Sequence, residues 1–252
     1  MNVAVFDTET IGLNKPFCYN VGMVIADTNS GAILKKYEWV IEQIWHNLPL
    51  FETAYYANKR PIYVKRMKAR KIKMKKWGQV TQEMRKIFKQ FKVVAAYAYN
   101  SPFDEKVFNF NCNWFKTQNP FENLPVYDIR GYAHAKICTT EKYKDFCDMN
   151  DRLTESGNYS TTAESVYQYL SGNTEFEEEH TALADSVIEW DILKHCVAHE
   201  CKWNMNYKVL VSIQNRHEKT FILTLPNGGD YIYKYRSLSF RKDAKTAYIK
   251  MK

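Results

Sequence analysis

The sequence has little of what marks several large protein classes. Only 9 glycines and 7 prolines occur among its 252 residues, far below the content of fibrous or disordered chains. Its uninterrupted apolar runs are short, as in Val93–Ala98, whereas a membrane helix needs about 20 apolar residues. The first ten residues have neither a basic head nor a cleavable apolar core, so we expect no secretory signal. These absences predict a soluble, cytoplasmic protein without membrane contact.

Several chemical motifs are also missing. The six cysteines form no C-x-x-C pair, which in a chain without a secretory signal predicts reduced thiols. The patterns G-x-x-x-x-G-K-[ST], G-x-G-x-x-G, G-x-S-x-G and H-E-x-x-H do not occur. Nucleotide-triphosphate hydrolysis, dinucleotide redox chemistry and serine-hydrolase chemistry are therefore disfavoured.

Positive charge, by contrast, is in excess. The chain has 36 Lys and Arg against 28 Asp and Glu, for a net charge of +8, which favours polyanionic partners such as nucleic acid. The densest basic stretch, an insertion at about residues 59–77, contains no acidic residue to balance it. We favour nucleic-acid contact through Lys68, Lys71 and Lys75, taken to line one helical face, over a merely solvated helix.

The hydrophobic pattern predicts an α/β fold, with a mixed five-stranded sheet flanked by helices. We expect antiparallel strands at Asn2–Thr10, 19–26 and 32–41, then a helix through Val80 and Phe91 and a strand at Val93–Ala98. A helix from Ser101 and a strand at 125–129 should follow. The last two expected elements are a helix with a Thr161–Glu164 capping box, buried along Ala163, Val166, Tyr167 and Leu170, and a helix at 181–201. Ser101 is the expected N-cap of its helix. The expected inner stripe of that helix is Phe103, Val107, Phe110 and Trp114.

The C-terminal part changes character at about residue 205. Apolar segments at 221–225 and 231–240 flank Pro226-Asn227-Gly228-Gly229, a strong hairpin signal, and residues 246–251 could add a strand. We therefore expect one domain at residues 1–203 and a small β-rich appendage at residues 204–252.

Three motifs place carboxylates where strands and helices meet. Asp7 and Glu9 project from one face at the end of the first strand, where their repulsion favours a bound cation such as Mg²⁺ or Mn²⁺. Asp104 opens a helix that follows a buried strand, the edge at which α/β sheets gather ligands. His180 and Asp185 flank the start of a late helix and can face one cavity. Each motif alone also has a structural explanation, as a solvated strand end, a helix-dipole partner or a structural histidine.

The order of the motifs is more specific than any one of them. D-x-E, N-x-x-F-D from Asn100 to Asp104, and H-x4-D from His180 to Asp185 follow one another along the chain. This combination resembles the DEDDh family of 3′–5′ exonucleases, in the ribonuclease-H-like superfamily, which includes proofreading epsilon-type subunits, ribonuclease T and oligoribonuclease. The resemblance extends over about residues 1–200, and Thr10-Ile11-Gly12-Leu13 is similar to the family's T-x-G-L continuation.

The resemblance implies a role for each motif residue. Asp7, Glu9, Asp104 and Asp185 would hold two divalent ions, Mg²⁺ or Mn²⁺, and His180 would accept the proton of the attacking water. Residues near the terminal nucleotide would be Thr8, Thr10, Leu13, Asn100 and Phe103. The expected reaction is removal of nucleoside monophosphates from single-stranded 3′ ends.

Three functions remain open at this level. The first is an exonuclease acting on DNA, with a polymerase or other replication or repair protein as a further partner. The second is a 3′–5′ exoribonuclease like ribonuclease T or oligoribonuclease, because these motifs do not encode a contact with the 2′-hydroxyl. The third, a nucleic-acid-binding module without catalysis, is disfavoured because all four acids and His180 are present.

Overall fold

The computed structural model describes residues 1–197, 208–215, 218–224 and 230–236, with side chains through Cys196. The chain divides into two compact units. The first comprises residues 1–126 and 178–190, and the second comprises residues 127–177 and those from Asp191 onward. No helix in the described part of the chain combines the length and apolar character needed to cross a membrane.

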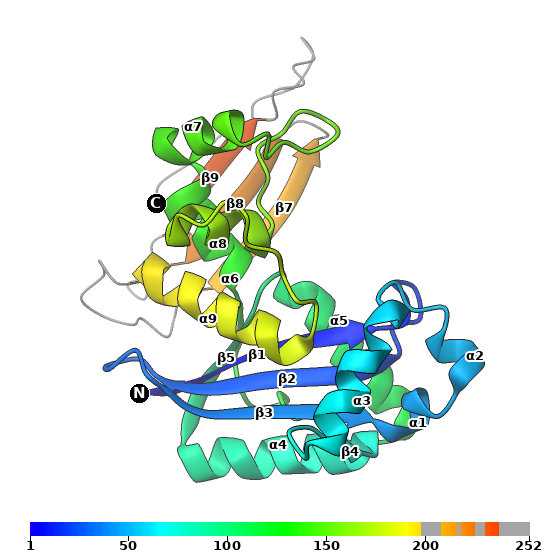
Figure 1. The fold of residues 1–252 in the computed structure, drawn as a ribbon. Coiled ribbons are helices and arrows are strands. Elements are labelled where there is room, and N and C mark those ends of the chain that lie inside the picture. Colours follow the sequence, from blue (N-terminus) through cyan, green and yellow to red (C-terminus); the bar gives the residue numbers. More distant parts are fainter. Residues whose placement is uncertain (198–207, 216–217, 225–229, 237–252) are drawn as a thin grey trace. The chain divides into compact units, whose positions relative to one another are not determined.

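The first unit is built on a six-stranded mixed sheet in the order β4-β3-β2-β1-β5-β6 (Figure 1). The strands are β1 (Asn2–Thr10), β2 (Cys18–Asp27), β3 (Ile33–Ile41), β4 (Lys73–Lys75), β5 (Val93–Ala98) and β6 (Val126–Asp128). β2 pairs antiparallel with β1 and β3, whereas β5 runs parallel to β1 and β4 parallel to β3. The predicted mixed sheet is confirmed. Its sixth strand, β4, was not predicted, because three residues are too short to show an apolar alternation.

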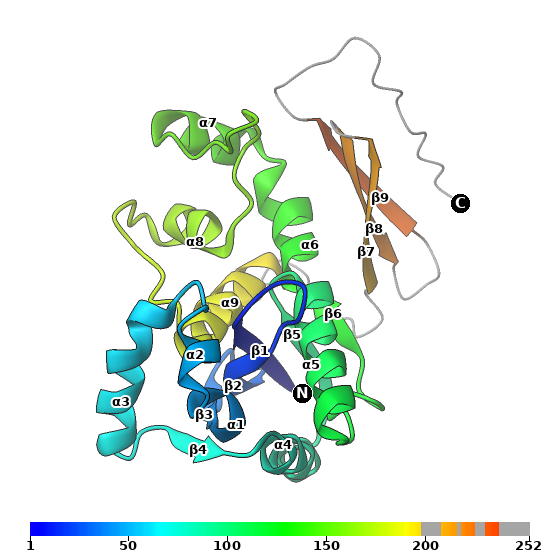
Figure 2. The same cartoon turned by 90° about the vertical axis from the view of Figure 1, so that its right-hand side faces the viewer.

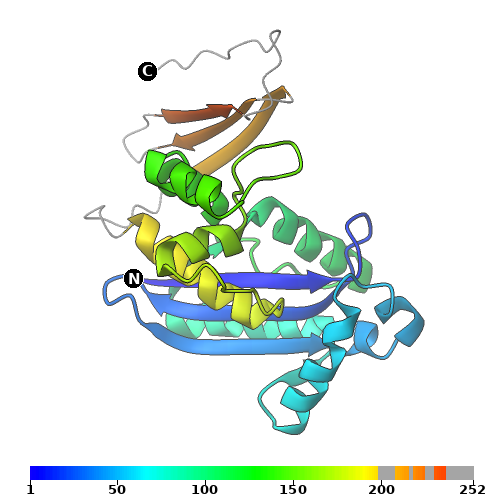
Figure 3. The same ribbon diagram turned by 45° about the horizontal axis from the view of Figure 1, so that its top comes forward.

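The two faces of this sheet receive different helices, because successive side chains of β1 point to opposite sides. Phe6 packs edge-on against Phe108 at 5.6 Å between ring centroids. Phe108 belongs to α5 (Ser101–Phe115), which shares its face of the sheet with α4 (Trp77–Phe91). The first turns of α9 (Ala182–Val197) contact the opposite face (Figure 2). Figure 3 shows β1, β2 and β3 side by side between these layers.

Helix α5 differs in detail from its prediction. Its N-cap is Asn100, in the left-handed region at φ 66°, and Ser101 is already helical, so the predicted serine cap was wrong. The buried positions are Ser101, Asp104, Val107, Phe108, Asn111 and Cys112, so of the predicted stripe only Val107 is buried, and Trp114 is 59% exposed. Aromatic residues occur on both faces of this helix, so periodicity alone could not choose the buried face. Packing against β1 chooses it, and Trp114 instead contacts Phe17 edge-on.

The basic insertion belongs to a longer segment between β3 and α4, which is folded into several short elements. These are α1 (Glu42–Trp45), α2 (Leu48–Phe51), a 3₁₀ turn at Ala57–Lys59, α3 (Arg60–Lys68) and strand β4. α3 ends at Lys68, Lys71 lies in the following turn and Lys75 lies in β4. The expectation that Lys68, Lys71 and Lys75 share one helical face is therefore wrong. Lys71 lies in a turn beyond the helix, and Lys75 belongs to β4, which pairs with the edge of β3.

The second unit contains helices α6 (Ile129–Ala133), α7 (Glu141–Met149) and α8 (Ala163–Ser171), a π-helical turn at His134–Cys138, and a three-stranded antiparallel sheet. The strands of that sheet are β7 (Lys208–Asn215), β8 (Glu218–Thr224) and β9 (Asp230–Arg236). The predicted β character of this part of the chain is confirmed, and β7 is an additional strand.

The start and buried face of α8 also differ from prediction. The hydroxyl of Thr162 accepts a hydrogen bond from the backbone N–H of Ser165 at 3.2 Å, so Thr162 is the N-cap. The predicted cap, Thr161, instead accepts a hydrogen bond from Arg130 at 2.9 Å. The buried residues include Val166 and Gln168, so of the predicted stripe only Val166 is buried. A run of three hydroxyl residues offered several caps, and the tertiary contact of Thr161 selected among them.

Some predictions fall outside the described residues. The predicted domain boundary at 203/204, the last residues of the 181–201 helix, the Pro226–Gly229 turn and the strand at 246–251 all do so. They stay predictions. Five of the six cysteines lie within the described side chains, and all five are free thiols, as expected: Cys18, Cys112, Cys138, Cys147 and Cys196.

Candidate active site

The site begins with the register between β1 and β2. Asp7 lies directly opposite Gly22, and Glu9 lies opposite Asn20. Directly opposed residues of an antiparallel pair project from the same face of the sheet. Both acids of the D-x-E motif therefore share a face with a glycine and an asparagine of the neighbouring strand.

Gly22 and Asn20 receive the start of α9. A Cβ atom on Gly22 would lie 2.0 Å from the carbonyl carbon of Ala182, so only glycine allows the helix to approach this closely. The Asn20 Oδ1 accepts hydrogen bonds from the Ala182 backbone N–H and from the Tyr63 hydroxyl, both at 3.0 Å. The Asn20 side chain thereby satisfies one of the unpaired N–H groups at the helix start. Together these contacts bring Asp185, in the first turn of α9, to the sheet.

Three carboxylates converge there. Asp7, Glu9 and Asp185 each offer an oxygen atom within 4.8 Å of those of the other two. Burial raises the pKa of Asp7 to about 7, and it raises the pKa of Glu9 well above its usual value, with further contributions from the charges of Asp7 and Asp104. Burial, followed by the charge of Asp7, raises the pKa of Asp185 to about 10. Three charged carboxylates are therefore unfavourable at this spacing unless a cation lies between them.

The donor set fits a hard divalent cation. Mg²⁺ and Mn²⁺ prefer carboxylate oxygens, and all three side chains supply them. The buried Oδ1 of Asp185 has no hydrogen-bond partner within the described structure, so this oxygen is available as a ligand. Asp7 and Asp185 are only half-buried, which leaves access from solvent. Mg²⁺ or Mn²⁺ would therefore be held by Asp7, Glu9 and Asp185.

Asp104 approaches β1 from the other face of the sheet. It lies in the first turn of α5, is 2% exposed, and accepts a hydrogen bond from the Thr8 hydroxyl at 2.6 Å. It is not one of the three carboxylates that lie within 4.8 Å of one another. Its charge nevertheless contributes to the raised pKa of Glu9. Asp104 thus borders the three-carboxylate cluster, in an orientation that Thr8 fixes.

His180 lies just before α9, outside the three-carboxylate cluster. Its ring stacks on that of Tyr56, with 4.2 Å between centroids and 14° between planes. Its Nδ1 is 3.7 Å from the Oε2 of Glu178, and its side chain is 29% exposed. Burial raises the pKa of Tyr56 to about 12, and the charges of Glu9 and Asp185 add to the shift, so the tyrosine and the histidine stacked on it lie near the cluster, with access to solvent.

Comparison with known proteins rests on structure. No protein-family model and no curated protein sequence matches this chain. Among solved structures, the nuclease domain of 3′hExo, described as a DEDDh family member bound to rAMP, has a TM-score of 0.53 and 14% identity, over 82% of this chain and 96% of that one. The chain has the fold of a DEDDh exonuclease.

Further structures share this DEDDh fold. A 3′-exonuclease in a structure of histone mRNA stem-loop recognition has a TM-score of 0.56 and 13% identity, over 83% of this chain and 87% of that one. Escherichia coli exonuclease I in complex with a dT13 oligonucleotide has a TM-score of 0.51 and 14% identity. The latter match covers 89% of this chain and 52% of the exonuclease.

The predicted substrate-binding residues differ in their surroundings within this DEDDh fold. Leu13 is 72% exposed, and its carbonyl accepts a hydrogen bond from the Lys106 ammonium at 2.8 Å, which ties the loop after β1 to α5. Phe103 packs partly buried against the core. The hydroxyl of Thr10 is 3.5 Å from the carbonyl of Gly12. An exposed apolar side chain such as Leu13 suits contact with a base.

Sequence reasoning missed several residues that shape the candidate site. Asn20 and Gly22 share the face of Asp7 and Glu9 only in the observed register. Glu38, 7% exposed and opposite Gly22 on β3, has its pKa raised to about 7 by burial. Glu189, 3% exposed, could have been found, because four residues after Asp185 on a helix is the same face.

Glu189 adds a further buried carboxyl to this region. Burial raises the pKa of Glu189 well above its usual value, and the charges of Asp7 and Asp104 add to the shift. Its Oε2 is buried without a hydrogen-bond partner in the described structure. The acidic character of the site is therefore greater than the four motif acids alone would give it.

Divalent cations should stabilise this protein more as pH rises. Between the usual pKa of 3.8 and the raised values of about 7 for Asp7 and about 10 for Asp185, the folded protein binds more protons than the unfolded chain. The stability of the metal-free protein should therefore fall as pH rises from about 5 to about 8.5. Mg²⁺ binds the deprotonated carboxylates, so its increment in melting temperature should grow over the same range.

Thermal unfolding with chelator or with Mg²⁺ at each pH measures both trends. The Asp185→Asn variant is the control, because it should flatten the pH dependence and reduce the Mg²⁺ increment. An increment that does not change with pH would argue against cation binding by these carboxylates.

Proposed function

We propose that this protein is a metal-dependent 3′–5′ exonuclease that hydrolyses phosphodiester bonds at single-stranded 3′ ends and releases nucleoside monophosphates. The observation that carries the proposal is the convergence of Asp7, Glu9 and Asp185 within 4.8 Å, in a chain with the fold of DEDDh exonucleases. Asp104 and His180 border this cluster, so each position of the family motif lies near it.

The proposed roles follow from the chemistry of a phosphodiester. Two divalent cations, when bound, would neutralise the negative charge that develops on the attacking and leaving oxygens. Asp7, Glu9 and Asp185 bind them together with Asp104, which the hydroxyl of Thr8 orients. His180 accepts the proton of the attacking water, a task suited to a side chain with an ordinary pKa near 6.5.

Residues beside the acids position the terminal nucleotide. Leu13, exposed at the end of β1, packs against the last base. Thr10 and Asn100 lie at the ends of β1 and β5 and face the sugar and phosphate, and Phe103 supports them from the core. The hydroxyl of Thr8 donates a hydrogen bond to Asp104, so the Thr8 side chain orients Asp104 and the Thr8 backbone contacts the nucleotide.

We propose DNA as the first substrate, with RNA as the alternative. Neighbours with the same fold are described with a ribonucleotide, a histone mRNA stem-loop and a dT13 oligonucleotide, so both classes have precedent. The basic surface of α3 favours a polymer longer than a dinucleotide. Association with a polymerase or another replication or repair protein stays a prediction.

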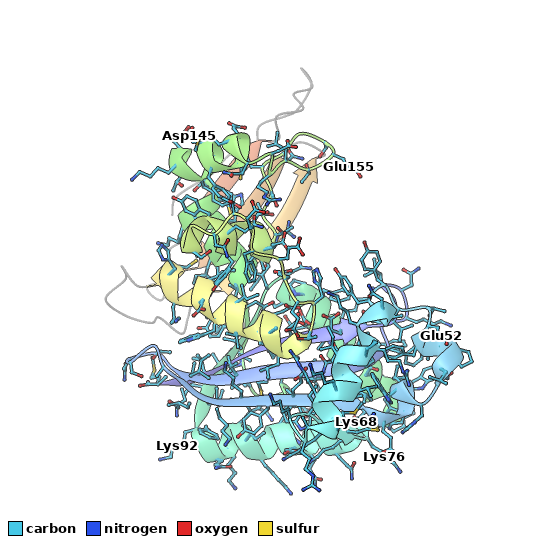
Figure 4. All side chains as sticks on the ribbon, in the orientation of Figure 1. Glu52, Lys68, Lys76, Lys92, Asp145 and Glu155 are labelled. Carbon is cyan, nitrogen blue, oxygen red and sulfur yellow. The ribbon has the colours of Figure 1, made fainter. Side chains whose placement is uncertain are left out.

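The exposed face of α3 is suited to the nucleic-acid backbone. Arg60, Pro61, Val64, Lys65 and Lys68 line a surface hollow of about 520 Å³, with apolar side chains between the cations. Within the described residues Lys65, Lys68 and Lys71 make no ion pair, whereas Lys75 pairs with Glu83. Lys65 therefore replaces Lys75 in the proposed contact surface, beside Lys68 and Lys71. Figure 4 labels Lys68 at the end of α3.

Removing this charge should weaken binding in a salt-dependent way. For single strands the slope of log K against log salt is about −0.7 per phosphate neutralised. Changing Lys65, Lys68 and Lys71 together to Gln should make the slope shallower by about 2 units if each lysine meets a phosphate. Turnover at saturating substrate should change little, because the carboxylates and His180 remain.

A salt titration of binding to a labelled oligomer in the presence of chelator measures the slope without cleavage. The matched control is Lys86→Gln with Lys89→Gln, which removes exposed charge from α4 on the opposite face of the sheet. If the two variants have the same slope of log K against log salt, α3 and the turn after it make no specific contact with the nucleic-acid backbone.

Degradation of matched DNA and RNA oligomers tests the proposed function itself. Each oligomer carries a 5′ label in one reaction and a 3′ label in another, with Mg²⁺, Mn²⁺ or chelator. The proposal predicts a ladder from the 5′-labelled strand, immediate release of a labelled monophosphate from the 3′-labelled strand, and neither with chelator. Binding without degradation under all conditions would favour a nucleic-acid-binding module.

A further inference from the structure

The stacked pair of Tyr56 and His180 joins two distant parts of the first unit. Tyr56 lies just before the basic insertion, between α2 and the turn that precedes α3, and is half-buried. Its ring covers one face of the imidazole, nearly parallel, at 4.2 Å between centroids. A near-parallel contact at this distance restricts rotation of the histidine about its side-chain bonds. Tyr56 thus holds the imidazole from one side.

Arg66 of α3 holds the residues on both sides of this histidine. Its guanidinium forms an ion pair with Glu179 and donates a hydrogen bond to the Thr181 hydroxyl at 3.2 Å. The same group lies 3.6 Å from the buried carboxylate of Glu38 on β3. The Thr181 hydroxyl in turn donates to Glu179 at 2.9 Å. Arg66 therefore connects the segment around His180 to the sheet.

The backbone of His180 needs such support. Its φ is 54°, in the left-handed region that residues other than glycine enter only when their surroundings hold them there. Tyr56 acts on its ring, while Arg66 acts on Glu179 and Thr181, its neighbours in the chain. Both side chains come from the segment between β3 and α4, which Tyr63 anchors through its hydrogen bond to Asn20.

We propose that Tyr56 and Arg66 are positioning residues for His180, so that the basic insertion forms part of the catalytic apparatus in addition to binding nucleic acid. This inference rests on the proposed function, in which His180 is the proton acceptor. Neither residue exchanges a proton with substrate. Each fixes the orientation in which the imidazole can receive one, because the ring is stacked and its backbone is tied on both sides.

Substitution of Tyr56 separates positioning from other roles. Tyr56→Leu removes the stacking face and should lower kcat about 10-fold to 100-fold with little change in KM, since misplacement of a catalytic group by about 1 Å has effects of this size. Tyr56→Phe keeps the ring and should restore kcat to within about 3-fold of wild type. Tyr55→Phe is the matched control, because it keeps the edge-on packing of the 88% exposed Tyr55 against Tyr56, at 4.8 Å between ring centroids, and should retain wild-type kcat.

A double-mutant cycle asks whether the effect passes through the histidine. In a His180→Ala background, Tyr56→Leu should cause no further loss of kcat, because nothing remains to be positioned. Arg66→Gln should behave in the same way in both backgrounds. Additive losses would overturn the proposal, as would a rise in KM at unchanged kcat, which would mean that Tyr56 contacts substrate directly.

A spectroscopic measurement keeps the inference testable apart from nuclease activity. In the metal-free protein, the imidazole Cε1–H signal of His180, assigned by its absence in His180→Ala, should be shifted by the ring current of Tyr56. The shift should persist in Tyr56→Phe and disappear in Tyr56→Leu. A wild-type protein that cleaves no oligomer but shows this pattern would refute the proposed function and leave the stacking contact intact. An unshifted signal in an active wild type would refute the positioning role alone.

Discussion

Replacing Asp185 by Asn should abolish metal-dependent cleavage and raise the melting temperature of the metal-free protein. The substitution keeps the shape of the side chain but removes a ligand charge. It also removes the cost of burying a carboxyl whose pKa rises from 3.8 to about 10. Each kcal/mol recovered should raise the melting temperature of a chain of this size by about 2–4 °C. Asp7→Asn should act in the same direction, with a smaller gain because its pKa rises only to about 7.

The measurements are single-turnover degradation of a labelled oligomer with Mg²⁺ and thermal unfolding with chelator. Asp191→Asn is the matched control, since Asp191 lies on the same helix but pairs with Lys194 at 2.6 Å. It should leave cleavage unchanged and should not raise the melting temperature. Near-normal turnover in Asp185→Asn or Asp7→Asn would show that the assignment of these carboxylates to metal ions is wrong.

Replacing His180 by Ala should lower kcat by about 10² to 10⁴, the usual contribution of a general base. Binding of a single strand should change little, because the histidine acts on the attacking water rather than on the polymer. Rising pH should partly restore the rate of the variant, since hydroxide from solvent then replaces the missing base. Steady-state kinetics between about pH 6 and about pH 9 separate these effects.

His46→Ala is the matched control for this prediction, because His46 is an exposed histidine of the same unit, beside α1. It should retain wild-type kcat at every pH. Normal turnover with weakened binding in His180→Ala would instead make His180 a substrate-binding residue, and the positioning role of Tyr56 would then concern the substrate.

The sequence predicted the elements of the first unit that have a strong local signal. Strand Val93–Ala98 is predicted residue for residue, and the helix through Val80 and Phe91 is present as α4. In such segments the spacing of the apolar residues matches either the helical or the strand period, and not both. The elements between β3 and α4 were missed, because α1, α2 and β4 are too short to show a period and α3 has no continuous apolar stripe.

The three sequence motifs also identified the acids that come together in the fold. Asp7, Glu9 and Asp185 do converge, and Asp104 and His180 border them. Their spacing along the chain was informative because strand ends and helix starts are the positions from which side chains reach a common edge. The roles assigned to them remain proposals.

What the sequence by itself determined is the order of the longer strands and helices and the acidic residues that converge in the fold, because local periodicity and motif spacing encode both. The tertiary structure decided which residues support the site. Asn20 and Gly22 receive α9 across a separation of about 160 residues, and Tyr56 and Arg66 hold His180 and its neighbours across more than 110. Such contacts depend on strand register and helix packing. No local pattern records them, because each partner alone is compatible with many positions.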